Sequence, residues 1–164
     1  MSKTEQNLKE AFAGESQANR KYLAFAKQAE KEGYPGVAKL FRAAAEAETV
    51  HAHAHLKVLE GIGATIDNLK EAIAGETHEF TKMYPAMIEE AKTEGNKKAE
   101  RSFNYANEVE KIHAALFQKA LDTLTNSKDV DYYVCPLCGY TCEERPPDNC
   151  PVCKAKAESF FKVG

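Results

Sequence analysis

The chain has 164 residues, a formal net charge of −3 and 29% charged residues. This length fits one domain, or one domain and a small module, and the charge balance excludes nucleic acid as an expected partner. No apolar run approaches the roughly twenty residues of a membrane span, and residues 1–10 lack a signal-peptide pattern. We therefore expect a cytoplasmic protein without a membrane segment, in which clustered cysteines indicate metal rather than disulfides.

Residues 1–126 have a helical composition, rich in Ala, Glu, Lys and Leu. Ser2 followed by Glu5 resembles a capping box and predicts a first helix that ends at Gly33. Pro35 predicts the start of a second helix. Gly61-Ile62-Gly63 ends the second helix. The residues from Thr65 to Leu69 begin a connection into a third segment, which closes at Gly95, and a fourth helix is expected from about Asn96 to about Thr125. Four long helices with one longer connection in the middle predict a four-helix bundle.

Composition changes after residues 125–129, TNSKD, which we interpret as a linker. The tail beyond it holds all five cysteines, together with tyrosines and prolines that are typical of strands and turns. A segment this short does not bury enough apolar surface to form a stable core alone. We therefore expect a bound metal ion to hold it together. We therefore predict two domains, residues 1–128 and residues 129–164.

Each predicted helix carries at least one glutamate within its apolar stripe. These residues are Glu15, Glu48, Glu76 with Glu79, and Glu110. An unpaired ionised carboxylate in a core costs several kcal/mol, and several together repel one another unless they are protonated or bind cations. For any single glutamate, a helix boundary misjudged by one or two residues is the simpler explanation. For four helices at once, a metal site explains the pattern better.

An internal repeat supports this interpretation. Glu15 recurs as Glu76 after 61 residues, within the similar stretches AGES and AGET. Glu48-x-x-His51 recurs as Glu110-x-x-His113 after 62 residues. A glutamate and a histidine three residues apart lie on one helix face and reach the same ion. Two such pairs and two lone glutamates form the two-metal carboxylate site of ferritin-like bundles, and these ligands suit iron or manganese.

The repeat also separates ligands from neighbouring polar residues. Glu79 lies one helical turn after Glu76, and its counterpart in the first half is Ala18, so it is an additional carboxylate on one side only. In the stretch EAETVHAHAH, neither Glu46 nor His53 lies on the core stripe, and both are expected to be solvated. His55 is expected to pack or to hydrogen-bond rather than to bind metal.

Cys135-x-x-Cys138 and Cys150-x-x-Cys153 predict a four-thiolate metal site. Cys142 breaks this spacing and is interpreted as a free thiol. The spacing alone leaves structural zinc and redox iron equally open. The neighbouring aromatic residues and the predicted di-iron site favour iron, because a cycling di-iron site needs electrons that zinc does not carry.

The order of these motifs resembles the rubrerythrin family over essentially the whole chain, including FAGESQANRKYLAFA, AGETHEFTKMYP and YVCPLCGY. The resemblance implies a ferritin-like four-helix bundle followed by a rubredoxin-like domain. It implies that Glu15 is terminal on the first iron, that Glu76 and His113 bind the second, and that Glu48 and Glu110 bridge. Glu79 and His51 would alternate on the first iron with oxidation state. Tyr22 and Tyr84 would hydrogen-bond carboxylates at the site, and Cys135, Cys138, Cys150 and Cys153 would hold one iron.

The same resemblance implies a peroxidase that reduces hydrogen peroxide to water in oxidative stress defence. The reaction also needs protons, and our hypothesis is that Glu79 carries them when it is released from the metal. Electrons would come through the tail from rubredoxin or an NAD(P)H-dependent reductase. Because one subunit's tail is expected to lie far from its own bundle iron, a homodimer or higher homo-oligomer with head-to-tail packing is predicted. The alternative functions are a ferroxidase that handles iron, as in ferritins, and a non-catalytic binding protein with structural zinc.

Overall fold

The computed structural model describes residues 2–126 and 128–164, so Ser127 of the expected linker and Met1 lie outside the described residues. The chain forms two compact units, residues 1–63 and residues 64–164, and each is described by itself. Within the described residues, no helix combines the length and the apolarity that crossing a membrane requires.

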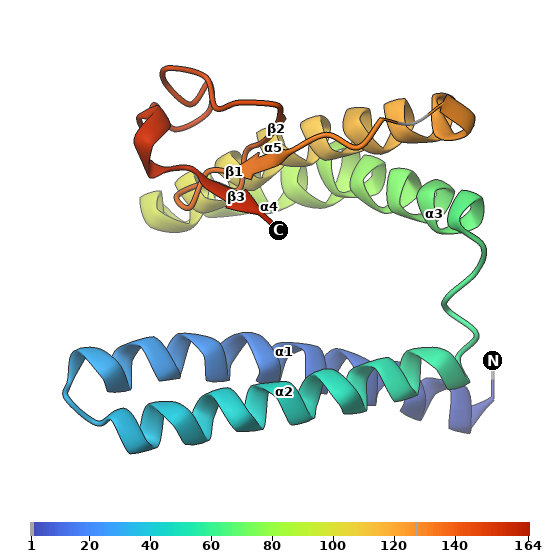
Figure 1. Cartoon of the computed structure of the whole chain (residues 1–164), viewed down its shortest axis with the longest axis vertical. Helices are drawn as coiled ribbons and strands as arrows, with labels where there is room; N and C mark the ends of the chain where they lie inside the picture. The colour runs from blue at the N-terminus through green and yellow to red at the C-terminus, as the bar shows by residue number, and fades with distance from the viewer. Residues whose placement is uncertain (1, 127) are drawn as a thin grey trace. The chain divides into compact units, whose positions relative to one another are not determined.

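The first unit is a hairpin of two helices, α1 (Lys3–Lys31) and α2 (Pro35–Val58) (Figure 1). The predicted cap is confirmed, because the Ser2 side chain accepts a hydrogen bond of 3.1 Å from the Glu5 N–H. Gly33 ends the turn after α1 with a φ of +83°, a conformation that favours glycine. Buried alanines, among them Ala38 and Ala45, allow the two helices to approach closely.

The second unit begins with a long helical run that contains one irregular turn. Helix α3 (Thr65–His78) leads into a π-helical turn, η1 (Glu79–Met83), and then into α4 (Tyr84–Thr93). The backbone N–H of Tyr84 donates to the carbonyl of Glu79, five residues back, which is the π-helical pattern. Gly95 closes this run, and Asn96 caps α5 (Lys97–Asp122) by accepting a hydrogen bond from the Ala99 N–H.

The tail is a small three-stranded antiparallel sheet. After the short 3-10 helix η2 (Leu124–Asn126), the chain forms β1 (Tyr132–Val134), β2 (Thr141–Glu143), the 3-10 helix η3 (Ala157–Ser159) and β3 (Phe161–Val163). The strand order is β2-β1-β3.

The chain reverses after α5, so that the tail lies along this helix within the second unit (Figure 1). An ion pair between Lys119 of α5 and Glu143 of β2 joins the two. The side chain of Val109, only 2% exposed, lies against Gly139 of the tail, where an added Cβ would stand 3.7 Å from it.

Candidate metal centres

The first unit brings together Glu15 of α1 and the pair Glu48 and His51 of α2. One ligand atom of each lies within 4.8 Å of the others. Glu48 and His51 are three residues apart on one helix face, and Nδ1 of His51 lies 2.9 Å from Oε2 of Glu48. The Glu48 side chain is 17% exposed and the His51 side chain 56% exposed. We call this cluster the first half-site.

The second unit brings together the corresponding residues, Glu76 of α3 and the pair Glu110 and His113 of α5, again within 4.8 Å. Nδ1 of His113 lies 2.8 Å from Glu110 and 3.7 Å from Glu76. All three side chains are partly buried, and His113 is 28% exposed. We call this cluster the second half-site. Its histidine is therefore half as exposed as that of the first.

Negative charge accumulates at the second half-site. Burial raises the pKa of the Glu76 carboxyl above its usual value, and repulsion from the Glu110 carboxylate raises it further, while His113 opposes the shift. Burial also raises the pKa of the Tyr84 hydroxyl, helped by Glu110, Glu79 and Glu76. A bound cation would relieve this repulsion, so the electrostatics as well as the donor atoms fit a metal ion.

Glu79 and the two tyrosines lie outside the tight clusters. Glu79 is half-buried, and its charge acts on Tyr84. The Tyr84 ring lies 6.3 Å from that of Phe103, and the Tyr22 ring 6.1 Å from that of Phe41. In the part of the chain that the structure describes, no hydrogen bond joins either tyrosine hydroxyl to a carboxylate.

The neighbouring polar residues of α2 lie apart from the first half-site. Glu46 and His53 are exposed, and His55 is half-buried. None of the three belongs to the described cluster. Only one of the three imidazoles in this stretch therefore lies among carboxylates.

The π-helical turn explains the change of offset in the internal repeat. Glu15 and Glu76 are 61 residues apart, whereas Tyr22 and Tyr84 are 62 apart, so the second half has gained one residue between Glu76 and Tyr84. Turn η1 occupies this interval, and Glu79 is its first residue. A π-helical turn holds one residue more than an α-helical turn, and such turns are frequent at functional sites. The additional carboxylate thus lies where the extra residue is accommodated.

The four predicted cysteines form one cluster in the tail. The Sγ atoms of Cys135 and Cys153 are 3.5 Å apart, as are those of Cys138 and Cys150. These distances exceed the ~2.05 Å of a disulfide and approach the ~3.8 Å edge of a tetrahedron with metal–sulfur bonds of ~2.3 Å. The geometry therefore fits a single four-coordinate metal ion.

Backbone N–H groups point at these sulfurs. Burial raises the pKa of the Cys138 thiol, while a hydrogen bond from the backbone of Tyr140 opposes the shift. Burial also acts to raise the pKa of Cys150, but hydrogen bonds from the backbone of Cys153 and Val152 outweigh it and lower that pKa. Such N–H groups stabilise the thiolate form that binds metal. Cys142 lies apart in β2, where its thiol donates toward the Arg145 carbonyl at 3.5 Å.

The tail contacts the second half-site directly. Nε2 of His113 lies 3.1 Å from Oγ1 of Thr141, and the Thr141 hydroxyl donates to the Gly139 carbonyl at 3.0 Å. The expectation that the tail lies far from the bundle site of its own chain is therefore wrong for this half-site, because the chain turns back along α5. Sequence reasoning missed Thr141, because it is 28 residues from His113 and a threonine in a strand carries no signal of its own.

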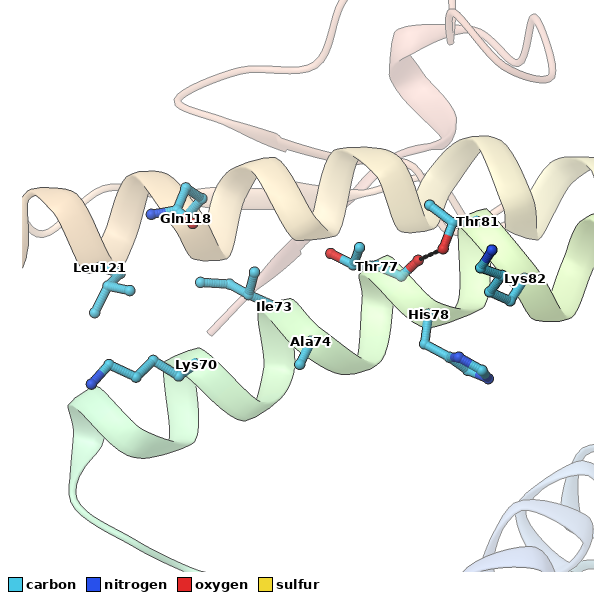
Figure 2. Close-up of a pocket in the computed structure, with 9 residues that line it drawn as sticks. All are labelled: Lys70, Ile73, Ala74, Thr77, His78, Thr81, Lys82, Gln118 and Leu121. Atoms are coloured by element: carbon cyan, nitrogen blue, oxygen red, sulfur yellow. Dashed lines mark hydrogen bonds between the residues drawn. The ribbon is translucent and has the colours of Figure 1, made fainter.

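Two of the hollows on the second unit are lined by residues of α3. One, of about 530 Å³, is lined by Glu76, His113, Tyr132 and Thr141 together with apolar residues, and it adjoins the second half-site. The other, of about 510 Å³, lies between α3 and α5 and is shown in Figure 2. Its lining includes Thr77 and Thr81, joined by a hydrogen bond, but no residue of the second half-site. The first hollow is therefore the one that adjoins carboxylates of the second half-site.

Known proteins match both parts of the chain. A family model described as rubrerythrin matches residues 6–121, and one described as rubrerythrin, rubredoxin-like domain matches residues 133–161. Rubrerythrin-2 of Clostridium acetobutylicum is 41% identical, over 93% of this chain and 92% of its own. Nigerythrin of Nitratidesulfovibrio vulgaris is 34% identical, over 96% and 85%.

A solved structure of nigerythrin in a partially reduced state matches 99% of this chain and 88% of its own, at 33% identity and a TM-score of 0.61. The predicted fold class, a mainly α ferritin-like four-helix bundle followed by a small rubredoxin-like domain, is confirmed. So is the predicted cofactor set, a carboxylate–histidine di-iron site and a four-cysteine iron site. The chain belongs to the rubrerythrin family.

Proposed function

We propose that this protein is a non-haem di-iron peroxidase that reduces hydrogen peroxide to water and protects the cell against oxidative stress. The observation that carries the proposal is the pair of matching half-sites, each with two carboxylates and one imidazole, together with a four-cysteine cluster in a tail that contacts one of them. Storage of iron needs no thiolate site, whereas repeated reduction of peroxide needs a supply of electrons. The rubrerythrin and nigerythrin relatives are consistent with this chemistry.

The residues of the two half-sites fit the iron pair. Glu15, Glu48 and His51 would hold one ion and Glu76, Glu110 and His113 the other, with Glu48 and Glu110 shared between them. Carboxylate oxygens and imidazole nitrogens suit iron. When bound in the ferrous state, the two ions supply the two electrons that divide hydrogen peroxide, one electron each.

The protein's own contribution is to position these ions and to move protons. Glu79 lies at the π-helical turn, close enough to Tyr84 to raise the pKa of its hydroxyl. In the proposed cycle, Glu79 and His51 would alternate as ligands of the first iron, and Glu79 would carry a proton when it is off the metal. Tyr22 and Tyr84 each lie beside a phenylalanine ring, Phe41 and Phe103 respectively. We assign both tyrosines a supporting catalytic role.

Electrons enter through the tail. Gly139 follows Cys138 in the chain, and the hydrogen bonds from Thr141 to Gly139 and between His113 and Thr141 link the cysteine loop to an iron ligand within one unit. The proposed upstream donor is rubredoxin or an NAD(P)H-dependent reductase. All five cysteines are free, which is consistent with the cytoplasm as the proposed location.

A homodimer is proposed from the length of the connection between the units. Ferritin-like bundles join their second and third helices by a long crossover that runs along the bundle. Helix α2 continues about 15 Å beyond Glu48, and α3 begins about 16 Å before Glu76. A crossover must therefore span about 31 Å. The link from Val58 to Thr65 reaches at most about 25 Å when fully extended.

The second copy is therefore proposed to supply the missing half of each bundle. Helix α2 exposes Leu40 by 68% and Val50 by 66%, which is an apolar surface that a partner would cover. Co-expression of Glu48→Ala and Glu110→Ala chains tests this directly. If units are exchanged, a mixed dimer has one doubly altered site and one intact site, and it recovers iron binding that neither variant has alone. If each chain builds its own site, no mixed dimer contains an intact one.

The proposed reaction is tested by reducing the iron-loaded protein without air and then adding oxidant. We expect hydrogen peroxide to reoxidise the iron much faster than dioxygen does, as followed by the ferric absorption. Faster reaction with dioxygen, with iron retained as mineral, would instead establish a ferroxidase. Absence of a ferric-thiolate band from native protein that holds zinc in the tail would remove the electron-transfer role.

A further inference from the structure

We propose that Thr141 is a positioning residue that holds the His113 ring in the orientation and tautomer needed to bind metal through Nδ1. The inference rests on the proposed role of His113 as a ligand and concerns a residue outside the predicted ligand set. It starts from the different partners of the two ring nitrogens of His113. Nδ1 of His113 faces Glu110 at 2.8 Å and Glu76 at 3.7 Å, whereas Nε2 faces Thr141 at 3.1 Å.

The direction of the hydrogen bonds follows from Thr141. A threonine hydroxyl has one proton to donate, and that of Thr141 is donated to the Gly139 carbonyl at 3.0 Å. Its oxygen therefore accepts, so Nε2 of His113 must carry the proton and donate it. With a proton kept on Nε2, Nδ1 is the ring nitrogen whose lone pair becomes available when a metal ion replaces its 2.8 Å hydrogen bond to the Glu110 carboxylate. The hydroxyl thus selects the tautomer that a metal ion at the half-site requires.

The surroundings keep Thr141 in place. It begins β2 and pairs with Val134 of β1, directly before Cys135. The tail is held on α5 by the Lys119–Glu143 ion pair and by the contact between Val109 and Gly139. Histidine ligands in metal sites usually donate their second N–H to such a partner, and its loss typically weakens metal binding by about 10–100-fold.

The first half-site provides the internal contrast. His51 also faces a carboxylate through Nδ1, at 2.9 Å from Glu48, but its side chain is 56% exposed. Among the described residues of the first unit, no hydrogen bond reaches the second ring nitrogen of His51, whereas Thr141 occupies this position at His113 within the second unit.

The test compares Thr141→Val, which removes the hydroxyl at nearly constant shape in a strand, with Thr141→Ser, which keeps it. The matched control is Thr93→Val, because Thr93 is an exposed residue at the end of α4 whose hydroxyl bonds only the Glu89 carbonyl. The full chain loaded with redox-inert Zn(II) is observed by proton–nitrogen NMR of the imidazoles. Wild type is expected to show a slowly exchanging Nε2–H on His113.

Thr141→Val is expected to expose this proton to fast exchange and to weaken metal binding at the second half-site by about 10–100-fold, while Thr141→Ser restores both. Thr93→Val is expected to leave both unchanged. The proposal is overturned if Thr141→Val keeps the slow Nε2–H and wild-type metal affinity, or if the proton of His113 is found on Nδ1. Because zinc NMR requires no turnover, a protein without peroxidase activity would overturn the proposed function and leave this inference standing.

Discussion

The two half-sites have the same donor atoms but different surroundings. Each has a lone glutamate and a glutamate–histidine pair on the next helix, and in each the histidine Nδ1 lies within 3 Å of its glutamate, at 2.9 Å in the first and 2.8 Å in the second. The first is formed by the helical hairpin of α1 and α2, and its histidine is 56% exposed in the single chain. The second is covered by the tail, and its histidine is 28% exposed and hydrogen-bonded to Thr141.

The Thr141 contact bears on how firmly each histidine would be held. A ring held at both nitrogens loses the freedom to swing away from a metal. In the proposed cycle only His51 would leave the metal, and His113, the ring that Thr141 contacts, would stay. The extra carboxylate that would replace His51, Glu79, lies in the half with the additional residue.

Removal of the tail metal should produce the largest difference between the half-sites. Cys150→Ser deletes a fully buried thiol of the cluster, and a small metal-stapled module without its metal is expected to unfold. Hydrogen exchange should then become fast over residues 129–164, and the second half-site should lose its Thr141 contact while the first is unchanged. Cys142→Ser is the control and should keep the tail protected. An equally protected tail in both variants would contradict the role of the metal.

Replacing each of the two histidines in a separate variant should distinguish their contributions to iron binding. His113→Gln removes the anchored ligand, and we expect the purified protein to lose the iron of the second half-site. His51→Gln removes the exposed ligand that is expected to be off the oxidised metal, so most iron should remain after aerobic purification. Iron analysis and Mössbauer spectra measure both. Equal losses in the two variants would show that burial and the tail contact do not distinguish the sites.

Glu79→Gln should slow peroxide turnover per bound iron by on the order of 10²-fold, because the amide neither carries the proton nor replaces His51 on the oxidised metal. Glu89→Gln is the matched control, since Glu89 is an exposed residue of α4 that pairs with Lys92. Stopped-flow reoxidation by peroxide measures the step. Unchanged turnover in Glu79→Gln would remove this residue from the mechanism.

The smallest effect concerns the metal-free protein. The pKa of Glu76 is raised in the folded state by burial and by Glu110, so the folded chain holds this proton more tightly than the unfolded chain. The free energy of unfolding should therefore fall as pH rises from the usual value of 4.5 through the raised pKa. Glu76→Gln should flatten this dependence and stabilise the apoprotein at neutral pH by at most about 1 kcal/mol after solvent screening.

Thermal unfolding of the apoprotein across this pH range measures the effect. Glu15→Gln makes the same charge change in the first half-site and serves as the matched control. A steeper pH dependence in Glu76→Gln than in wild type would contradict the assigned sign. The same substitution should weaken iron binding, so it is expected to stabilise the empty protein and destabilise the loaded one.

The sequence predicted the features that depend on residue type and regular spacing. The Ser2 cap, the glycine ends of the helices, and the clustering of Glu15 with Glu48 follow from helical periodicity and from the repeat. The contact of Thr141 with His113 was not predictable, because it depends on how the chain reverses after α5. The repeat offsets of 61 and 62 differ by one residue, and the structure shows a π-helical turn at Glu79–Met83, between the two repeated motifs. The division into domains 1–128 and 129–164 and the individual ligand roles stay predictions.

The π-helical turn has a consequence for how a duplicated site acquires new chemistry. One extra residue in a regular helix rotates everything after it by about 100° and would turn Tyr84 away from the face that Tyr22 occupies. A single wide turn absorbs that rotation locally, so the helix beyond it regains its phase. An insertion can therefore be accommodated without displacing any ligand already present. Glu79 stands where the first half has Ala18 and begins this turn, so the two halves differ both in helix length and in one residue type.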